Sequence, residues 1–537
     1  MVEKEQQNNY KVFLPCAGIG SRLGEFVKNI NKGLISVDNR PIISHLMEKF
    51  DEDIEIVVAL GYKGEYVKQF LEITYPNRIF TFVTVDNYDK KGSGLGHTLL
   101  CCKEYLQCEF IFMVNDLIIL DEIPSLQKMA GLNNWLGYSD VKGGIHYRTV
   151  AFDNRGLITD LFEKNESADN PTYLGICGIK DYKNFWKFSD TDEFILKGES
   201  HSIQKMIENN IRFDSVKFDF YDSGHKEELM KTRKKMITEN SPIILEKQGE
   251  SIWFVGDDVI KFSINENFIK NRFKRSSILH PYVPKVNKTT ENMYSYRYVN
   301  GRIFSEVLTV ENFKFFLDYM EIFWLSKKNI DSKIFKDKCM KFYKDKTYKR
   351  IEQYFEIFNN CDSDREVING TSVPSIYELL DEIDWNWISD GVPVRFHGDL
   401  HFENILVSEK NNYNILPFIL LDWRQDFCGE LEYGDVYYDL AKLMHGLIIS
   451  HEIINKNLYN FDRSMNEIKY DFLRKNINID CEEIFLEYIE NWGYDVKKVK
   501  VMTALIFLNI AKFHHYPYSH LLFYLGKNLL NNEGKTI

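Results

Sequence analysis

Short apolar runs alternate with amphipathic stretches over residues 10–235, and this alternation limits the fold more than any other feature of the sequence. Residues 54–60 (IEIVVAL) are predicted to form a strand, residues 61–63 then turn into a helix, and residues 80–85 (FTFVTV) form the next strand. Strands that alternate with helices usually build a parallel, doubly wound sheet that binds ligands over its carboxyl edge. The sequence therefore predicts an α/β domain with a mostly parallel sheet.

A loop with two glycines follows the first predicted strand, residues 12–16 (VFLPC). Glycines at such a point let backbone N–H groups hold a triphosphate, and fixed cations beside them stabilise a leaving pyrophosphate. A lone G-x-G is more often a tight turn, and the sequence lacks the G-K-[ST] of a Walker loop and the third glycine of a dinucleotide fingerprint. The residues predicted to bind nucleotide or to act in catalysis here are Ala17, Gly18, Gly20, Ser21, Arg22 and Lys32.

Acidic residues follow this loop at the ends of later predicted strands. Asp116 follows the apolar run 110–114 and Asn115, and Asp222 lies in the segment Tyr221–Gly224 (YDSG). Each acid alone is more often a solvated turn residue. Together they suit attack of a phosphate oxygen on a nucleotide α-phosphorus, because Mg²⁺ and cationic side chains stabilise the charge and little proton transfer is needed.

The order of these motifs resembles the G-x-G-x-R-(x)n-P-K, Gly-Asp, Glu-Lys and W-x-D-x-G elements of the sugar-phosphate and phosphocholine nucleotidyltransferases. Asn31 stands where that family has proline, and Asn115 stands where it has glycine. The resemblance implies that Asp116 and Asp222 bind Mg²⁺ and that Lys164 meets the substrate phosphate. It also implies the short form of the fold, without a β-helix extension.

A second glycine-rich loop, residues 92–97 (GSGLGH), precedes a predicted helix. In the same family this region packs against the nucleotide base, which makes Gly94 a nucleotide-binding candidate, and a simple hairpin turn is an equally good interpretation. Trp135 and Tyr173 are candidates for the wall of the substrate pocket, although aromatic residues are usually part of the core.

The segment His397–Asn404 (HGDLHFEN) has residue types suited to transferring phosphate from ATP to a hydroxyl group. Asp399 and Asn404 are five residues apart, close enough for one loop to direct both side chains at one phosphate. Asp422 follows the apolar run 418–421, which is predicted to be a buried strand. An aspartate at 399 would accept the proton of an attacking hydroxyl, and Asn404 and Asp422 would hold the Mg²⁺ of ATP.

This layout is similar to the protein-kinase catalytic loop, and its His-Gly-Asp resembles the aminoglycoside phosphotransferase and choline kinase family, which phosphorylates small molecules. Lys261 occupies the Val-Ile-Lys position that pairs with ATP phosphates in kinases, although no convincing glutamate partner follows it in the next predicted helix. Residues 293–301, with Tyr296 and Tyr298, resemble the hinge strand that contacts adenine. The sequence thus predicts residues 1–240 as a nucleotidyltransferase domain and residues 241–537 as a two-lobed, kinase-like α+β domain.

The substrate of the second domain is less constrained. Choline kinases commonly carry an acid after the metal-binding aspartate and its aromatic neighbour, whereas this chain has Arg424 there. An arginine would repel a quaternary ammonium and favour a sugar, a polyol or an anionic substrate. It could equally point away and pair with Asp426 or Glu430.

The two activities would operate in sequence. An ATP-dependent kinase makes a phosphorylated sugar, polyol or amino alcohol, and the nucleotidyltransferase couples it to an NTP, with CTP favoured, to give a precursor for decorating surface glycans. Mg²⁺ is expected at both sites. The same motifs would also suit a choline kinase and phosphocholine cytidylyltransferase that makes CDP-choline. An antibiotic kinase with an inactive N-terminal half, or a binding protein made of inactive enzyme domains, is disfavoured because the metal ligands and Arg22 and Lys32 are all present.

Net charge, the length of the apolar runs and the cysteine spacing limit the expected partners and location of the protein. A net charge of −12 argues against a nucleic-acid-binding face, and the apolar runs are too short to span a membrane. The nine cysteines have no regular spacing and are expected to be reduced thiols, and the polar N-terminus lacks a signal segment, so the cytoplasm is the expected location. Small-molecule substrates and nucleotides are the expected ligands, and the oligomeric state stays open.

Overall fold

The structure is a computed structural model that describes residues 10–90, 93–123, 134–237, 247–325, 330–359, 362–408 and 416–534. The chain divides into two compact units. The first unit comprises Met1–Glu266 and Asn287–Tyr298, and the second comprises Asn267–Val286 and Val299–Ile537. The domain boundary predicted between residues 240 and 241 lies outside the described residues and stays a prediction.

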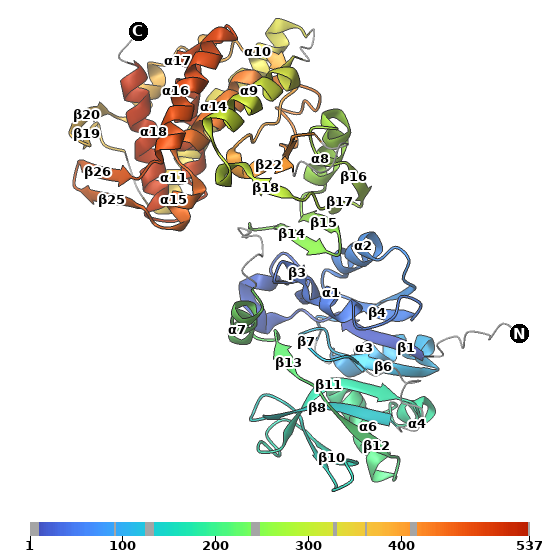
Figure 1. Ribbon diagram of the computed structural model, residues 1–537. Helices are drawn as coiled ribbons and strands as arrows, with labels where there is room; N and C mark the ends of the chain where they lie inside the picture. The colour runs from blue at the N-terminus through green and yellow to red at the C-terminus, as the bar shows by residue number, and fades with distance from the viewer. Residues whose placement is uncertain are drawn as a thin grey trace, which may run out of the picture. The chain divides into compact units, whose positions relative to one another are not determined.

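Nine strands of the described residues form the main sheet of the first unit (Figure 1). One half has the order β6-β1-β4-β5, and all its neighbours run parallel. In the other half β11 runs antiparallel to β6, β8 and β9, and β10 is antiparallel to β9, whereas β12 pairs with β8 in parallel. The bounds are β1 Tyr10–Cys16, β4 Ile56–Leu60, β5 Phe80–Thr84, β6 Glu109–Met113, β8 Asn134–Lys142, β9 Thr149–Phe152, β10 Ile158–Phe162, β11 Pro171–Ile179 and β12 Phe213–Lys217.

The prediction of an α/β domain is confirmed, but the prediction of a mostly parallel sheet is only half right. It holds for β6, β1, β4 and β5 and is wrong for the half around β11. Apolar runs show where strands lie, but they do not encode strand direction in the absence of a helix between the strands.

Both faces of this sheet are covered. Along β1, Val12 and Leu14 contribute to one apolar core, whereas Phe13 contributes to another, because successive side chains of a strand point to opposite faces. The first core also contains residues of α1 and α2, and the second contains residues of α3, α4 and α6. The helices of this unit are α1 Ile42–Met47, α2 Gly64–Thr74, α3 Leu95–Cys102, α4 Tyr182–Lys187, α5 Asp192–Lys197, α6 Glu199–Glu208 and α7 Lys226–Met236.

A smaller sheet joins this unit, with the strand order β14-β15-β17-β16. The strands are β14 Glu250–Val255, β15 Asp258–Ser263, β16 Val286–Thr289 and β17 Met293–Arg297. The Trp253 ring packs edge-on against Phe70 of α2, with centroids 5.3 Å apart.

Polar contacts tie the same sheet to α2. The buried Gln69 amide oxygen accepts hydrogen bonds from the Asn292 backbone N–H at 2.9 Å and from the Thr290 hydroxyl at 2.8 Å. The apolar face of the small sheet is therefore part of the core of the first unit.

The second unit is mainly helical. A short sheet of β18 (Gly301–Ile303), β22 (Ile405–Ser408) and β23 (Phe418–Leu420) carries the loops of the predicted kinase motif. The Phe418 ring packs against Phe316 and Tyr319 of α9, and α14 packs against α16 and α17. The main helices are α8 Glu266–Leu279, α9 Val310–Trp324, α10 Ser332–Met340, α11 Lys346–Phe358, α14 Val436–Ile448, α16 Asn476–Asn491, α17 Val496–Ala511 and α18 Tyr518–Gly534.

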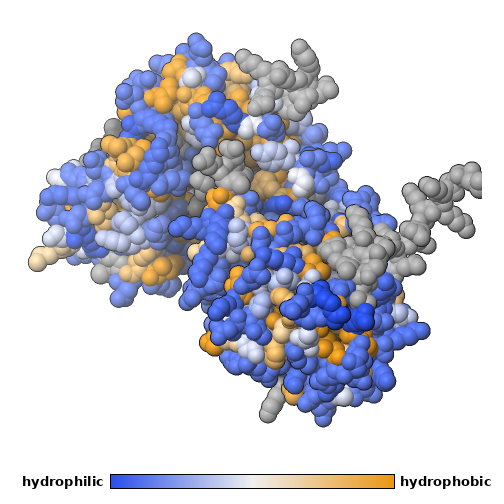
Figure 2. Space-filling model, turned by 60° about the horizontal axis from the view of Figure 1, so that its bottom comes forward, coloured by the Kyte–Doolittle hydropathy of each residue, from blue (hydrophilic) through white to orange (hydrophobic). Residues whose placement is uncertain are grey.

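Further short elements complete this unit: α12 Ile376–Asp381, α13 Trp385–Ile388, α15 His451–Asn455, β19 Arg365–Ile368, β20 Thr371–Pro374, β21 Pro393–Val394, β24 Gly434–Asp435, β25 Tyr459–Ser464 and β26 Glu467–Phe472. Among the described helices, none has both the length and the apolar composition that crossing a membrane requires. On the face drawn in Figure 2, hydrophobic residues are scattered among hydrophilic ones, as is normal for a protein surface.

Candidate active sites

A cavity of about 490 Å³ lies at the carboxyl ends of β1 and β6 in the first unit. The loop after β1 forms one wall of it. Gly20 adopts a left-handed conformation (φ 71°), and a Cβ atom added there would lie 3.2 Å from Cβ of Lys32. Both constraints favour glycine at this position. The predicted residues that line the cavity are Ala17, Gly18, Gly20, Ser21, Arg22, Lys32, Gly94, Asp116, Lys164, Tyr173 and Asp222.

Asn31, which stands where the resembled family has proline, fixes the turn before Lys32 through hydrogen bonds. Its side chain is fully buried, its amide group donates to the carbonyl oxygens of Cys16 at 2.9 Å and Tyr62 at 2.7 Å, and its amide oxygen accepts from the Gly33 N–H at 2.9 Å. These bonds connect the end of β1 to the turn that carries Lys32. The Lys32 ammonium group then reaches Oδ2 of Asp116 at 3.0 Å.

The two predicted metal ligands face one another across Gly224. A Cβ atom added to that glycine would lie 3.2 Å from Oδ1 of Asp222 and 3.4 Å from Oδ2 of Asp116. The Ser223 backbone N–H and hydroxyl both donate to the Asp116 carbonyl oxygen, at 2.9 and 2.7 Å, which holds the two segments together. Two carboxylates on either side of one glycine fit a hard divalent cation such as Mg²⁺, which prefers oxygen ligands.

Basic side chains around the cavity shift the pKa values of Asp116 and Lys164. Burial raises the pKa of Asp116, but Lys32 and Arg22 outweigh burial and hold that pKa below its ordinary value. Burial lowers the pKa of Lys164, and the neighbouring Arg22 and Arg148 lower it further. The cavity therefore combines a carboxylate that stays ionised with several cations, a combination suited to binding polyphosphate through a metal ion.

Several residues that line the cavity carry no signal in the sequence and were not predicted. The Tyr147 hydroxyl donates to Oδ2 of Asp222. The Arg148 guanidinium reaches Glu163 at 2.9 Å and Glu199 at 3.1 Å. Tyr147 and Arg148 come from the turn between β8 and β9, where no motif or periodicity marks them. Only their aromatic and basic character could have drawn attention to them.

The prediction that Trp135 forms a wall of the pocket is wrong. The Trp135 side chain is fully buried in β8, its ring lies 6.1 Å from that of Phe218, and it is not among the residues that line the cavity. Its indole packs against Gly178 of β11, where an added Cβ atom would lie 2.1 Å from its Nε1. Trp135 is a core residue, the usual role of a large aromatic side chain.

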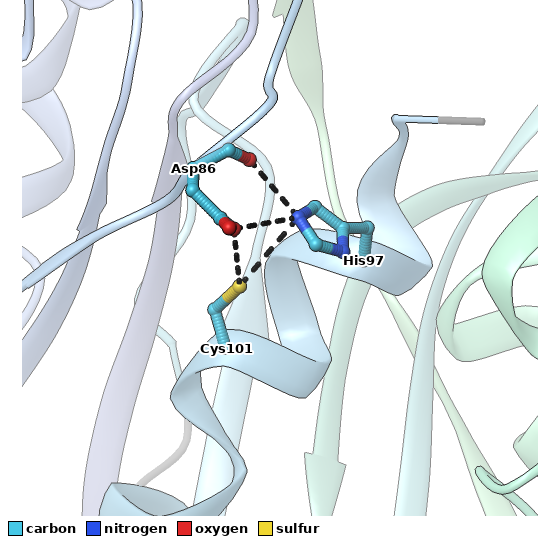
Figure 3. Close-up of side chains that lie close together, drawn as sticks. All are labelled: Asp86, His97 and Cys101. Carbon is cyan, nitrogen blue, oxygen red and sulfur yellow. Dashed lines mark hydrogen bonds and ion pairs between the residues drawn. The ribbon is translucent and has the colours of Figure 1, made fainter. Parts of the chain in front are cut away.

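A cluster beside the cavity, shown in Figure 3, could hold a divalent ion of a different kind. His97 and Cys101 are one turn apart on α3 and face Asp86. The His97 Nε2 lies 3.2 Å from Oδ1 of Asp86 and 3.7 Å from the Cys101 sulfur, and that sulfur lies 3.9 Å from the same Oδ1. Nitrogen, sulfur and oxygen ligands at these separations suit a borderline-soft ion rather than Mg²⁺.

In the second unit, Asp399 lies in the loop before β22, and its side chain is 37% exposed, so a substrate can reach it. The Lys442 ammonium group, from α14, lies 2.9 Å from Oδ1 of Asp399. Burial raises the pKa of Asp399, but Lys442 and His401 outweigh burial and hold that pKa well below its ordinary value. The carboxylate is therefore ionised at neutral pH.

Asp439, also on α14, holds the backbone of the same loop. Its carboxylate accepts the N–H groups of His397 at 2.8 Å and Gly398 at 2.7 Å, and the Trp324 indole N–H at 3.1 Å. Gly398 has a φ of 86°, a left-handed conformation that favours glycine. The glycine of His-Gly-Asp thus has a local backbone role in this chain.

The predicted metal ligands of the second unit come from neighbouring segments. The Leu421 N–H donates to the Asn404 carbonyl oxygen at 2.7 Å, which brings Asn404 and Asp422 close together. The Asn404 amide group donates to the Asp399 carbonyl oxygen at 3.0 Å, which leaves its amide oxygen for a cation. Asp422 also contacts the Arg272 guanidinium, 3.0 Å from its Oδ1. One amide and one carboxylate oxygen fit Mg²⁺, which takes its other ligands from water and phosphate.

The remaining candidates lie in both units. Lys261 is in β15 and Tyr296 in β17, both are buried, and Tyr298 follows β17 with 50% exposure. These three residues belong to the first unit, whereas Asp399, Asn404 and Asp422 belong to the second. Arg424 turns its Nε toward the Asp426 carbonyl oxygen at 3.0 Å, and its guanidinium lies over the Phe342 ring.

Comparison with known proteins finds relatives for part of the chain. No protein-family model matches it. The bifunctional protein GlmU of Methanococcus maripaludis is 22% identical over 258 residues, which cover 46% of this chain and 59% of that protein. GlmU of Methanocaldococcus jannaschii is 24% identical over 253 residues, with the same two coverages. The UTP–glucose-1-phosphate uridylyltransferase AglF of Haloferax volcanii is 24% identical over 232 residues, which cover 40% of this chain and 90% of that protein.

Solved structures give similar coverage. A UDP-glucose pyrophosphorylase in complex with UDP-glucose covers 42% of this chain with 18% identity and a TM-score of 0.35. The CTP:phosphocholine cytidylyltransferase of Streptococcus pneumoniae covers 42% with 17% identity and a TM-score of 0.36. The chain spans 59% of the length of the two GlmU relatives. On the strength of the sequence relatives, the N-terminal part of the chain is nucleotidyltransferase-like.

Proposed function

We propose that this chain is a bifunctional enzyme that phosphorylates a small hydroxyl compound with ATP and then couples the product to an NTP. The observation that carries the nucleotidyltransferase part of the proposal is the arrangement of Lys32, Asp116 and Asp222 around one cavity at the carboxyl edge of the sheet. Sequence relatives that transfer nucleotides support it.

The charged residues of this cavity are suited to nucleotidyl transfer. Arg22 and the glycine loop hold the triphosphate, and Lys32 neutralises the charge that develops on the leaving pyrophosphate. Lys164 and Arg148 face the same cavity and bind the phosphate of the second substrate. A phosphate oxygen of that substrate attacks the α-phosphorus, and the bond to the pyrophosphate breaks. Mg²⁺ held by Asp116 and Asp222 would supply additional charge stabilisation.

The observation that carries the kinase part of the proposal is the contact between Lys442 and Asp399, which keeps a partly exposed carboxylate ionised. Asp399 accepts the proton of the acceptor hydroxyl as that oxygen forms its bond to the γ-phosphorus of ATP, and ADP leaves. Asp439 fixes the loop that aims Asp399. Mg²⁺ held by Asn404 and Asp422 would neutralise charge on the ATP phosphates.

The two reactions form one route, because the product of the kinase is the phosphorylated substrate of the nucleotidyltransferase. Joining both activities in one chain raises the local concentration of the intermediate. We favour CTP as the second nucleotide and a hydroxyl compound of the sugar or polyol type, neutral or anionic, as the acceptor, with the NDP-linked product used in decorating surface glycans.

The proposal is tested by screening small alcohols and sugars for ADP release, and then each product with the four NTPs for pyrophosphate release. Wild-type protein should give both signals in a Mg²⁺-dependent manner. ADP release without any pyrophosphate release from the products would leave only the kinase. Pyrophosphate release from supplied sugar phosphates without any ADP release would leave only the nucleotidyltransferase.

A further inference from the structure

Three basic side chains of the second unit, one of them beside the Asp399 loop, have no carboxylate partner among the described residues. Lys346 begins α11, Arg350 lies one turn further along the same helix, and Arg424 follows the loop of Asp422. We call Lys346, Arg350 and Arg424 the cation cluster. Unpaired cations that are partly removed from water are costly unless an anion compensates them.

Aromatic rings hold the cation cluster in place. The Lys346 ammonium group lies 4.2 Å from the centroid of the Phe342 ring and 5.2 Å from that of Tyr438. The Arg424 guanidinium carbon lies 4.8 Å from the same Phe342 centroid. Two cations therefore share one aromatic ring. A π-helical turn over Lys341–Asp345 precedes α11 and places Phe342 beneath Lys346, and such turns occur frequently at functional sites.

The cation cluster adjoins the predicted catalytic base. A Cβ atom added to Gly398 would lie 2.6 Å from Cβ of Arg424, so Arg424 packs directly against the residue before Asp399. Burial lowers the pKa of Lys346 well below its ordinary value, and Arg424, Lys442 and Arg350 lower it further. These side chains therefore lie close enough to repel one another.

The nearby acids are engaged elsewhere. Glu430 pairs with Lys338, and Asp399 pairs with Lys442. A carboxylate oxygen of Asp426 accepts the Gly429 N–H at 2.8 Å, and Arg424 contacts only the carbonyl oxygen of that aspartate. Among the described residues, the cation cluster is thus left without a paired carboxylate, and its Arg424 packs against the loop of Asp399.

We propose that the cation cluster binds a negatively charged group of the acceptor, so that the compound phosphorylated by this chain is a hydroxyl compound bearing a carboxylate or a phosphate. The inference rests on the proposed kinase function of the second unit. Arg424 and Arg350 offer guanidinium forks that match either anion, and Lys346 adds a point charge. The hydroxyl oxygen forms the new bond to the γ-phosphorus, the bond between that phosphorus and the β–γ bridging oxygen breaks, and the proton passes to Asp399.

The test compares acceptors that share a carbon skeleton and differ in charge. Glycerol, glycerate and glycerol 3-phosphate form one series, glucose and gluconate form a second, and choline is the cationic probe. ADP release by the full-length protein is measured for each, with Asp399→Asn as the background. The proposal expects an anionic member of a series to have a kcat/KM at least about tenfold above its neutral partner, because one charged hydrogen bond contributes that much. Glycerate and glycerol 3-phosphate separate carboxylate from phosphate recognition.

Two variants connect the preference to the cation cluster. Lys346→Gln and Arg424→Gln should each raise KM for the preferred anionic acceptor about tenfold or more, leave KM for ATP unchanged, and reduce the preference over the neutral partner. Lys349→Gln removes the same charge from the exposed face of α11 and should change none of these values. A loss of packing alone would lower activity toward charged and neutral acceptors equally.

The outcomes separate this inference from the function on which it rests. Asp399-dependent ADP release with glycerol, glucose or choline at rates equal to or above those of the anionic compounds would overturn the inference and leave the kinase standing. If no compound gave Asp399-dependent ADP release, the proposed kinase function would fail and the inference would fail with it.

Discussion

The ammonium group of Lys32 lies 3.0 Å from Oδ2 of Asp116, although the two residues are 84 positions apart in the sequence. Each of them follows a strand of the parallel half of the sheet, Lys32 through the loop after β1 and Asp116 through the short segment after β6. Because β1 and β6 are parallel neighbours, their carboxyl ends meet at one edge.

Replacing Lys32 by Met should lower nucleotidyl transfer about 10²–10³-fold, because a fixed charge beside the leaving pyrophosphate is lost. Pyrophosphate release with a supplied sugar phosphate measures the effect. Lys32→Arg keeps the charge and should retain more activity than Lys32→Met. Equal loss in both variants would indicate a purely geometric requirement.

The two sites should respond independently to substitution of their carboxylates. Asp116→Asn should abolish pyrophosphate release and leave ADP release unchanged, whereas Asp399→Asn should do the reverse. Both products are measured for both proteins, and circular dichroism checks that each variant is folded. Loss of both activities in a folded variant would contradict the assignment of separate sites.

Lys442→Met should move the acid limb of the kinase pH–rate profile to higher pH, because the cation that lowers the pKa of Asp399 is gone. Asp399 acts as a base only when it is deprotonated, so activity would then be lost at a higher pH as the solution is acidified. Lys442→Arg keeps the charge and should keep the wild-type profile. An unchanged profile in Lys442→Met would show that Lys442 does not set this pKa.

Asn31→Pro would restore the residue of the resembled family, yet it should destabilise the first unit. The substitution removes the Asn31 donor from the carbonyl oxygens of Cys16 and Tyr62. Each lost hydrogen bond costs about 1 kcal/mol. Chemical denaturation followed by tryptophan fluorescence measures the loss, and Asn31→Asp, which keeps the acceptor for Gly33 only, should fall between the two. A proline variant as stable as wild type would refute this role.

Trp253→Ala should lower the free energy of unfolding by about 3–5 kcal/mol, because the ring is fully buried against α2. Phe254 is its matched control, since the next residue of β14 faces the opposite side and is only partly buried. Phe254→Ala should cost clearly less in the same urea titration. Similar costs would mean that the small sheet is not packed into the first unit.

Motifs at strand ends are the most predictable part of the molecule. Glycine, lysine and aspartate after apolar runs predict which residues line the N-terminal cavity, because parallel strands bring such ends together. Tyr147 and Arg148 are not predictable, since they reach the cavity from a turn whose path depends on the antiparallel half of the sheet. The prediction for Trp135 is wrong because an aromatic residue has the same sequence signature in a pocket wall as in a core.

The packing of the small sheet is also beyond sequence reasoning. The alternating pattern of β14 and β15 predicts two strands, and it contains nothing about which neighbour covers their apolar face. Gln69 illustrates the difficulty, because a glutamine in an amphipathic helix is ordinarily solvent-exposed, and here it is the polar anchor for residues more than 200 positions later.

The discontinuous make-up of the first unit has a consequence for biosynthesis. Its last segment, Asn287–Tyr298, is translated after Asn267–Val286, which belongs to the other unit. A nascent chain that has emerged only as far as α7 still lacks the strands that cover Tyr66, Gln69 and Phe70, so the earliest-made half of the protein stays incomplete on the ribosome until residue 298 has left the exit tunnel.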